Sequence, residues 1–356
     1  MRAHPEPCHI ERGTRASRAG AIVGLLLLAT LVAMPWWGGR AGQRLATEFF
    51  YTLALAQMWN LLAGYGGLLS VGQQAFVGLG GYALVVLGLH AGLNPFLVVP
   101  LAGLVTGLLA IPTAAVVFRL RGAYFAVGTW VVAEVFRLLI ANTAAVGGGS
   151  GLSVTQTVKG IPAWWRDAYT LWTALALGAG ATLLVYWLLR SRHGLALTAV
   201  RDSETAAASV GVSVLRVKWL VFILSAIGCG MTGALIYITK LRISPDAAFS
   251  LDWTVTMFFV VVIGGIGTIE GPLVGTLVYF ALRETLSDYG SGYMIALGSV
   301  AVAFMLWIPR GIWGTIAARY DLHFFPVQRR IRPGAVALPA SRGLLHRLRT
   351  ALLRAG

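Results

Sequence analysis

The feature that most constrains this sequence is its series of long apolar blocks, each about as long as a membrane-spanning helix. A helix needs about 20 mostly apolar residues to cross the hydrocarbon core of a bilayer. The 356 residues are 57% hydrophobic and only 12% charged, with a mean hydropathy of +0.76, whereas soluble domains carry about 25% charged residues. The blocks lack the ten-residue alternation of a membrane β-barrel. The sequence therefore predicts an all-α polytopic membrane protein.

The positive charge of the chain is concentrated in a few segments. The net charge is +15, and outside four segments the basic and acidic residues balance. Because Lys and Arg mark the cytoplasmic loops of membrane proteins, we expect all four to face the cytoplasm. The segments are residues 1–20, the turn 119–121, the loop 190–218 and the tail 310–356.

About ten transmembrane helices satisfy this charge distribution and place both termini in the cytoplasm. All four basic segments lie on the same side only if an even number of spans separates each of them from the next. The first block must therefore stay as a span and is not a cleaved signal peptide ending near Pro35. The two short blocks at 251–265 and 272–286 are either full spans or a re-entrant pair. In both cases the chain returns to the same side of the membrane. The predicted spans are 21–37, 45–63, 68–89, 96–118, 122–141, 169–189, 219–239, 251–265, 272–286 and 293–309.

This topology divides the chain into three parts: a cytoplasmic tail (1–20), a transmembrane domain (21–309) and a basic cytoplasmic tail (310–356). Residues 142–168 form the long extracytoplasmic loop, in which glycines at 147–149 and 151 indicate a mobile backbone and Trp164 and Trp165 favour the membrane interface. We expect the basic C-terminal tail to contact lipid headgroups, and we expect no nucleic-acid partner.

Polar side chains are rare in the predicted spans, so each of them is a candidate for a role in transport. An amide in hydrocarbon needs a partner, and it either bonds to a neighbouring helix or contacts a passing zwitterionic solute. Two glycine-rich segments, 66–81 and 264–275, lie in opposite halves of the chain, where such interruptions are typical of a transport pathway or of close helix packing. The first segment is surrounded by Asn60, Ser70, Gln73 and Gln74.

Glu134 and Arg137 are three residues apart in the span 122–141 and so share one helix face. Ionisable groups cost about 2.5–3.5 kcal/mol each in a membrane helix, which favours mutual pairing. The pair either neutralises itself near the extracytoplasmic end or forms a charged part of the solute route.

The cytoplasmic loop 190–218 contains a short alanine-rich stretch from Arg201 to Gly211. Asp202 and Ser203 are suited to cap a helix, and Gly211 is suited to end it. A small-faced helix in the cytoplasm can dock in a groove of another protein.

Taken together, these motifs resemble the permease subunits of bacterial ABC importers for branched-chain amino acids, of the LivM type. Residues 60–73, which read NLLAGYGGLLSVGQ, together with Phe76 are similar to the family's NLLxGYxGxxSxGxxxF stretch. The resemblance covers residues 48–314 and continues at residues 121–126, at Glu134, at 201–211, at 264–272 and at 309–311.

The resemblance implies a vitamin/sugar permease-like bundle of about ten spans and two sets of functional residues. The substrate-pathway set is Asn60, Ser70, Gln73, Gln74, Phe76, Tyr124, Glu134, Gly264 and Gly265. The ATPase-coupling set is Arg201, Glu204, Ala206, Ala207 and Gly211. In related importers the coupling pattern is Glu-Ala-Ala, three residues and Gly, and Glu204 is displaced by one residue from that pattern.

The resemblance also implies partners in the bacterial inner membrane: a second permease subunit, two ATP-binding subunits and a periplasmic substrate-binding protein. The cargo is a branched-chain or other hydrophobic amino acid, with urea or short amides as the alternative in the same family. The chain itself is not expected to be an enzyme, because no lysine follows a glycine and a phosphate-binding Gly-Lys-Ser/Thr loop is therefore missing.

Two other classes of membrane protein are less consistent with the sequence. A secondary transporter driven by an ion gradient would usually need a series of intramembrane carboxylates, and a membrane protease would need a Ser-His or paired-Asp arrangement. The predicted spans contain no histidine, so we expect no metal centre, and we expect no cofactor. Cys8 and Cys229 are the only cysteines and suggest no disulfide.

Overall fold

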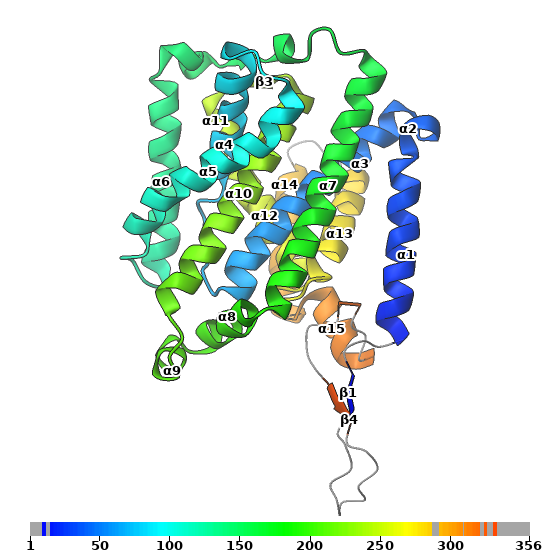
Figure 1. Cartoon of the computed structure of the whole chain (residues 1–356), viewed down its shortest axis with the longest axis vertical. Helices are drawn as coiled ribbons and strands as arrows, with labels where there is room; N and C mark the ends of the chain where they lie inside the picture. Colours follow the sequence, from blue (N-terminus) through cyan, green and yellow to red (C-terminus); the bar gives the residue numbers. More distant parts are fainter. Residues whose placement is uncertain are drawn as a thin grey trace, which may run out of the picture.

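The structure is a computed structural model of the whole chain, and it describes residues 9–11, 15–286, 292–308, 310–320, 324–325 and 330–332. The described chain is a bundle of helices that run roughly between two ends, joined by short loops (Figure 1). Most of the N-terminal and C-terminal tails lies outside the described residues.

The first half of the bundle contains six α-helices and two π-helical turns. Each π-helical turn continues an α-helix, so α3 with η1 and α4 with η2 form longer helical units. The elements are α1 (Arg15–Val32), α2 (Met34–Trp37), α3 (Gly39–Asn60), η1 (Leu61–Tyr65), α4 (Gln74–Ala83), η2 (Leu84–His90), α5 (Pro95–Val117) and α6 (Ala123–Ala141).

The second half begins with a loop of three 3-10 turns and continues with nine α-helices. The turns are η3 (Ala144–Val146), η4 (Gly148–Ser150) and η5 (Thr155–Val158). The helices are α7 (Ala163–Arg190), α8 (Arg192–Asp202), α9 (Glu204–Ser209), α10 (Val214–Lys240), α11 (Pro245–Ala248), α12 (Asp252–Gly264), α13 (Gly271–Leu286), α14 (Gly292–Trp307) and α15 (Gly311–Tyr320).

Among the residues that the structure describes, four short strands form two antiparallel pairs at the ends of the bundle. Strand β1 (His9–Glu11) pairs with β4 (Arg330–Arg332) and joins the two tails. Strand β2 (Leu152–Ser153) pairs with β3 (Arg242–Ile243) and ties the loop between α6 and α7 to the end of α10. The glycines of this loop, predicted to make it mobile, serve as turn residues here, with positive φ at Gly147, Gly148 and Gly151.

Six helical segments among the described residues are long and apolar enough to cross a membrane. They confirm that the chain is a polytopic helical membrane protein, while the full number of ten spans stays a prediction. The segments are Pro95–Val117, Ala123–Ala141, Ala163–Arg190, Val214–Lys240, Pro245–Gly264 and Gly298–Tyr320.

Two of the predicted spans differ from the helices in the structure. The predicted span 68–89 has no helix before Gln74, because residues 66–73 leave the helical path at Gly67, whose φ is +67°. The predicted span 21–37 is interrupted at Ala33, where α1 ends before α2. The two short blocks correspond to α12 and α13, which pack closely and antiparallel: a Cβ built on Gly275 would lie 1.8 Å from the carbonyl oxygen of Val260.

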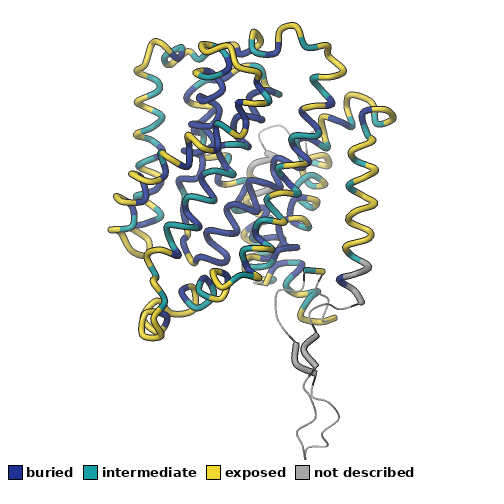
Figure 2. Tube along the Cα trace, in the orientation of Figure 1, coloured by how far each residue is buried: buried dark blue, intermediate teal, exposed yellow. Residues whose placement is uncertain are grey.

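Helix α10 lies at the centre of the bundle, and glycines allow its neighbours to approach it backbone to backbone. A Cβ built on Gly80 of α4 would lie 2.0 Å from the carbonyl oxygen of Gly230 in α10. Thr106 of α5 also approaches α10 and donates a hydrogen bond to the carbonyl of Ala226 at 3.1 Å. Figure 2 shows α10 mostly buried, whereas α1 and α6 are exposed along much of their length.

The described parts of the four basic segments lie at one end of the bundle. In Figure 1, the start of α1, the turn between α5 and α6, helices α8 and α9, and helix α15 all lie toward the lower end. The long loop between α6 and α7 lies at the upper end. The segments that carry the net positive charge are thus on one side of the bundle, as a common cytoplasmic location requires.

Candidate functional site

The predicted cytoplasmic helix is present as α9, and local capping explains where it begins and ends. Ser203 separates α8 from α9, and its hydroxyl accepts a hydrogen bond from the backbone N–H of Ala206 at 3.3 Å. Gly211 follows the helix with φ +86°, a conformation that glycine adopts without strain. Asp202 does not cap the helix but pairs with Arg201 at 3.0 Å.

The coupling residues divide between those that hold α9 and those that face outward. Ala207 is 2% exposed and lies against the body of the protein. Glu204 forms an ion pair of 2.5 Å with Lys218 of α10, so its carboxylate fixes α9 to that helix. Ala206 and Gly211 are exposed.

Large apolar side chains are exposed in the segment that contains α8, α9 and the start of α10, at the end of the molecule that carries the basic segments. Val210 is 76% exposed, Leu195 75% and Leu215 56%. We call these three residues the inner patch. Exposed apolar side chains outside the hydrocarbon region are typical of a protein-binding surface, and these three flank the short helix α9 in the sequence.

Arg201 connects α8 with η1 and with the second glycine-rich segment. Its Nη1 donates a hydrogen bond to the carbonyl oxygen of Gly64 at 3.4 Å. Gly64 lies against Gly267, since a Cβ built on Gly64 would be 2.6 Å from the Gly267 nitrogen. We call the meeting point of Gly64, Arg201 and Gly267 the inner junction.

Two amides of α3 hold the loop between α12 and α13 in place. Asn60 is fully buried, and it donates to the carbonyl of Thr268 at 2.8 Å while accepting from the N–H of Gly267 at 2.9 Å. Gln57, one turn earlier, donates to the carbonyl of Ile269 at 2.8 Å. Both amides therefore provide hydrogen-bond partners for backbone groups of a non-helical loop. In this conformation the amide of Asn60 has a structural role.

The same loop also contacts the C-terminal segment. Glu270 is 8% exposed, and its Oε1 accepts hydrogen bonds from the backbone N–H groups of Phe324 at 3.0 Å and Phe325 at 2.9 Å. Gly311, at the start of α15, packs on Gly265, whose φ is +127°. The loop therefore links the inner junction to α15.

Side chains from three other helices form hydrogen bonds with polar groups of the non-helical segment 66–73 and of Gln74, which follows it. Trp59 donates to the carbonyl of Ser70 at 3.0 Å, and Thr129 accepts from the N–H of Val71 at 3.1 Å. The Gln74 side-chain oxygen and backbone N–H both bond to Thr254.

Four predicted pathway residues at and after this break are buried inside the chain. The Ser70 hydroxyl accepts from the N–H of Gly72 at 3.2 Å. Phe76 packs edge-to-face on Phe222 with ring centroids 5.6 Å apart. Gln73 is fully buried, and its amide atoms have no hydrogen-bond partner among the described residues. Gln74, bonded to Thr254, is also buried.

The predicted pair of Glu134 and Arg137 is present and extends to a third residue. Arg137 Nε donates to Glu134 Oε1 at 2.9 Å, and its Nη1 donates to Asp246 of α11 at 2.6 Å. We call Glu134, Arg137 and Asp246 the outer triad, because it lies toward the C-terminal end of α6. The Asp246 side chain is 78% exposed and that of Glu134 45%.

The structure therefore does not bring the predicted pathway residues into one site. Tyr124, which is 77% exposed, and Glu134 lie on α6, whereas Asn60, Gly264 and Gly265 lie near the inner junction. Gly264 packs on α13, since its Cβ would lie 1.9 Å from the carbonyl oxygen of Gly271. Among the residues that the structure describes, no three His, Cys, Asp or Glu side chains are placed to hold a metal ion.

Three residues that form several of these contacts were not selected from the sequence. Gln57 is an amide within the predicted span 45–63, so the rule that selected Asn60 would also have selected it. Glu270 and Asp246 lie in loops or short helices, and their partners are 54 and 109 residues away. No local pattern indicates such pairings.

Comparison with known proteins identifies related sequences. The sequence model of the family described as "Branched-chain amino acid transport system / permease component" matches residues 43–308. A high-affinity branched-chain amino acid transport system permease protein LivM from Salmonella typhimurium is 29% identical over 313 residues, covering 81% of this chain and 73% of the relative.

Two further relatives carry similar descriptions. The protein of the same description from Escherichia coli K12 is 28% identical over 318 residues, which is 82% of this chain and 74% of that one. A probable branched-chain amino acid transport permease protein LivM from Methanocaldococcus jannaschii is 26% identical over 216 residues, covering 60% and 61% of the two chains. No solved structure matches the chain.

The contacts of Asn60 predict that Asn60→Leu destabilises the protein. The substitution leaves the buried Gly267 N–H and Thr268 carbonyl without partners, at a cost of about 1–3 kcal/mol for each group that stays dry. We expect a clearly lower midpoint of thermal unfolding in detergent than for the parent protein.

The matched control is Asn142→Leu, because the Asn142 amide is exposed and bonds only to the end of its own helix. This change should alter the free energy of unfolding by no more than about 0.5 kcal/mol. Equal midpoints for the Asn60 and Asn142 variants would show that the amide of Asn60 does not stabilise the loop.

Proposed function

This chain belongs to the family of permease components of branched-chain amino acid transport systems, and we propose that it forms half of the pathway of an ATP-driven importer. Its cargo would be branched-chain or other hydrophobic amino acids. The importer would sit in a bacterial inner membrane with a second permease subunit, two ATP-binding subunits and a periplasmic binding protein. The observation that carries this proposal is α9 with the inner patch, at the basic end of the bundle.

Helix α9 would be the element on which the ATP-binding subunits act to drive transport. The chain has no Gly-Lys-Ser/Thr loop and cannot bind ATP phosphates in that way, so the motor must be a partner. A short helix with a small-residue face and exposed apolar neighbours fits a groove of another protein. Ala207 and the Glu204–Lys218 ion pair hold α9 firmly on the bundle, as a helix that transmits force requires.

Movement of α9 would reach the membrane through the inner junction. Helix α8 is directly joined to α9 at Ser203, and Arg201 at its end contacts Gly64. Gly64 packs on the loop that Gln57 and Asn60 hold. A displacement of α8 would therefore act on α3 and on the α12–α13 pair together.

The pathway itself would lie along the exposed face of α6, opposite the second permease subunit. Of the six helices able to span the membrane, α6 is the least buried. It also carries two residues of the outer triad, and ionisable groups that face lipid cost about 2.5–3.5 kcal/mol each. A face that carries such charges favours contact with water or protein over contact with lipid.

Tyr124 and Glu134 would then face the solute, while the buried pathway residues would act behind this surface. Movement at the break 66–73 and at the 265–270 loop would change the position of α6 through the contact of Thr129 with Val71. We assign this supporting role to Asn60, Ser70, Gln73, Gln74, Phe76, Gly264 and Gly265.

The outer triad bears on the choice of cargo. It presents a guanidinium and two carboxylates, and charges of both signs are suited to a zwitterionic amino acid. Urea and short amides carry no ionised group, so this arrangement favours amino acids over them. An ion-gradient-driven carrier, the other alternative, would give α9 and the inner patch no role.

We expect Val210→Glu to uncouple the permease from its ATPase. The carboxylate would place a charge in the proposed apolar contact, and an unpaired charge buried at an interface is costly. In cells that express all subunits, co-purification of the ATPase and amino acid uptake should both fall by at least about tenfold, which corresponds to about 1.4 kcal/mol of binding. The amount of permease in the membrane should not change.

The control is Leu93→Glu, which introduces the same charge at an exposed leucine between η2 and α5, where we expect the extracytoplasmic side. It should leave ATPase co-purification at the parent level. Normal co-purification and uptake in the Val210→Glu variant would refute the proposed docking surface.

Labelling of single cysteines would test the pathway along α6. In a Cys8→Ser, Cys229→Ala background, we expect Val131→Cys to react with a charged, water-soluble thiol reagent in the assembled transporter. We expect Leu108→Cys, on the uncharged helix α5, to stay unreacted because it faces lipid. Both parent side chains are at least half exposed in the single chain, and an unreactive Val131→Cys would place α6 against lipid or in a dry contact.

A further inference from the structure

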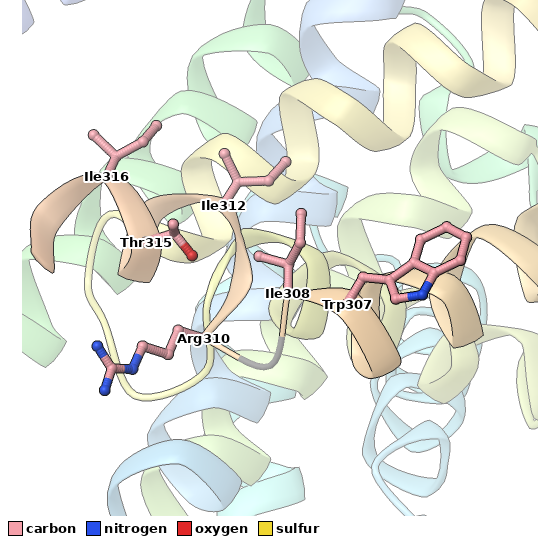
Figure 3. A pocket seen from close by; sticks show the side chains of 6 residues that line it. All are labelled: Trp307, Ile308, Arg310, Ile312, Thr315 and Ile316. Carbon is pink, nitrogen blue, oxygen red and sulfur yellow. The ribbon is translucent and has the colours of Figure 1, made fainter. Parts of the chain in front are cut away.

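A cavity of about 360 Å³ lies where α14 ends and α15 begins. It is lined by Trp307, Ile308, Arg310, Ile312, Thr315 and Ile316. In Figure 3, Ile308, Ile312 and Ile316 extend from the ribbon toward the same side. Arg310 and Trp307 extend toward opposite ends of the group. The cavity therefore has an apolar wall of isoleucines and a cationic edge.

The cavity lies on the outer surface of the described bundle, next to exposed side chains at the end of α14. Trp307 is 82% exposed and Leu306 73% exposed, and both belong to the end of α14. Helix α15 then packs inward through Gly311 and Trp313, which are buried, and leaves Arg319 and Tyr320 on the surface. Tryptophan and arginine at the end of a spanning helix are typical of the headgroup region of a bilayer.

The charge around the cavity favours an anionic occupant. Arg310 is exposed, and within the described part of the chain no carboxylate forms a salt bridge with it. Helix α15, which follows Arg310, carries Arg319 and no acidic residue. The cavity also lies at the same end as α8 and α9 (Figure 1), where we expect the cytoplasmic leaflet with its anionic lipids.

We propose that this cavity binds an anionic phospholipid of the cytoplasmic leaflet. Arg310 contacts the phosphate of the headgroup, and an acyl chain lies along Ile308, Ile312 and Ile316. An apolar wall alone would accept any lipid chain, and an arginine alone would accept any anion. The two together, at the level of the headgroups, fit a molecule that has both parts.

Lipid at this position would bear on the inner junction. Gly311 at the start of α15 packs on Gly265, and Gly265 begins the loop that contains Gly267 and Glu270. A phospholipid that fixes α15 would therefore stabilise the loop as well. The proposal rests on the membrane location and the expected orientation of the chain, and it is independent of the proposed coupling to an ATPase.

The test is lipid binding by the purified full-length chain, measured by native mass spectrometry and by thermal unfolding in detergent. The probes are phosphatidylglycerol, phosphatidylcholine with the same acyl chains, and inorganic phosphate. We expect phosphatidylglycerol to bind and to raise the unfolding midpoint more than phosphatidylcholine does, and we expect phosphate alone to have no effect. Equal effects of the two lipids, or an effect of phosphate alone, would overturn the proposal without the use of any variant.

The variant that tests the site is Arg310→Gln, with Arg319→Gln as the matched control, because Arg319 is an exposed arginine near the other end of α15 and does not line the cavity. Arg310→Gln should weaken phosphatidylglycerol binding by about fivefold, the factor expected for one cation at a bilayer surface, and should leave phosphatidylcholine binding unchanged. Arg319→Gln should bind both lipids like the parent protein. If Arg310→Gln keeps parental lipid binding but loses its ATP-binding subunits, the cavity is a protein contact and the proposal is wrong.

Discussion

The whole structure depends on how backbone groups are satisfied where a helix is interrupted within a membrane protein. Hydrocarbon offers no hydrogen-bond partner, so a non-helical segment persists only where the protein supplies one. At the 265–270 loop, Asn60 and Gln57 of α3 supply it. At the 66–73 break, Trp59 and Thr129 do the same. Because most of these partners come from distant parts of the chain, the two interruptions also hold the helices together.

The second constraint is electrostatic and acts on the molecule as a whole. Arginines are concentrated in four segments, and the fold brings the described parts of these segments to one end of the bundle. That end also carries α9, the inner patch and the cavity beside Arg310. The proposals for a motor contact and for a lipid contact thus both follow from the same asymmetry, although they concern different surfaces.

The sequence predicted features that depend on neighbours along the chain. Six of the apolar blocks, the capping of α9 by Ser203 and the pairing of Glu134 with Arg137 all follow from local spacing, and the described part of the structure confirms them. The resemblance to branched-chain amino acid permeases was also confirmed. Features that depend on tertiary contacts were missed, such as Asp246 joining Arg137.

The predicted pathway residues show that the polarity of a residue in a span is not enough to assign its role. A polar residue in a span must avoid lipid, but this rule does not distinguish a packed interior from a solute route. Asn60 and Gln74 satisfy the rule through bonds within the chain, whereas Glu134 lies on an exposed face. Only the fold separates these two cases, because the distinction depends on which helices cover each side chain.

The central claim is that the arginine-rich end of the bundle faces the cytoplasm and presents α9 there. It is tested most directly by labelling single cysteines from each side of the membrane, at Ser203→Cys before α9 and at Ser150→Cys in the loop between α6 and α7. Both parent side chains are exposed. We expect an impermeant thiol reagent outside intact spheroplasts to label only Ser150→Cys, and to reach Ser203→Cys only in inverted vesicles. Labelling of both positions from the same side, or labelling in the reverse order, would contradict the topology and every functional proposal that rests on it.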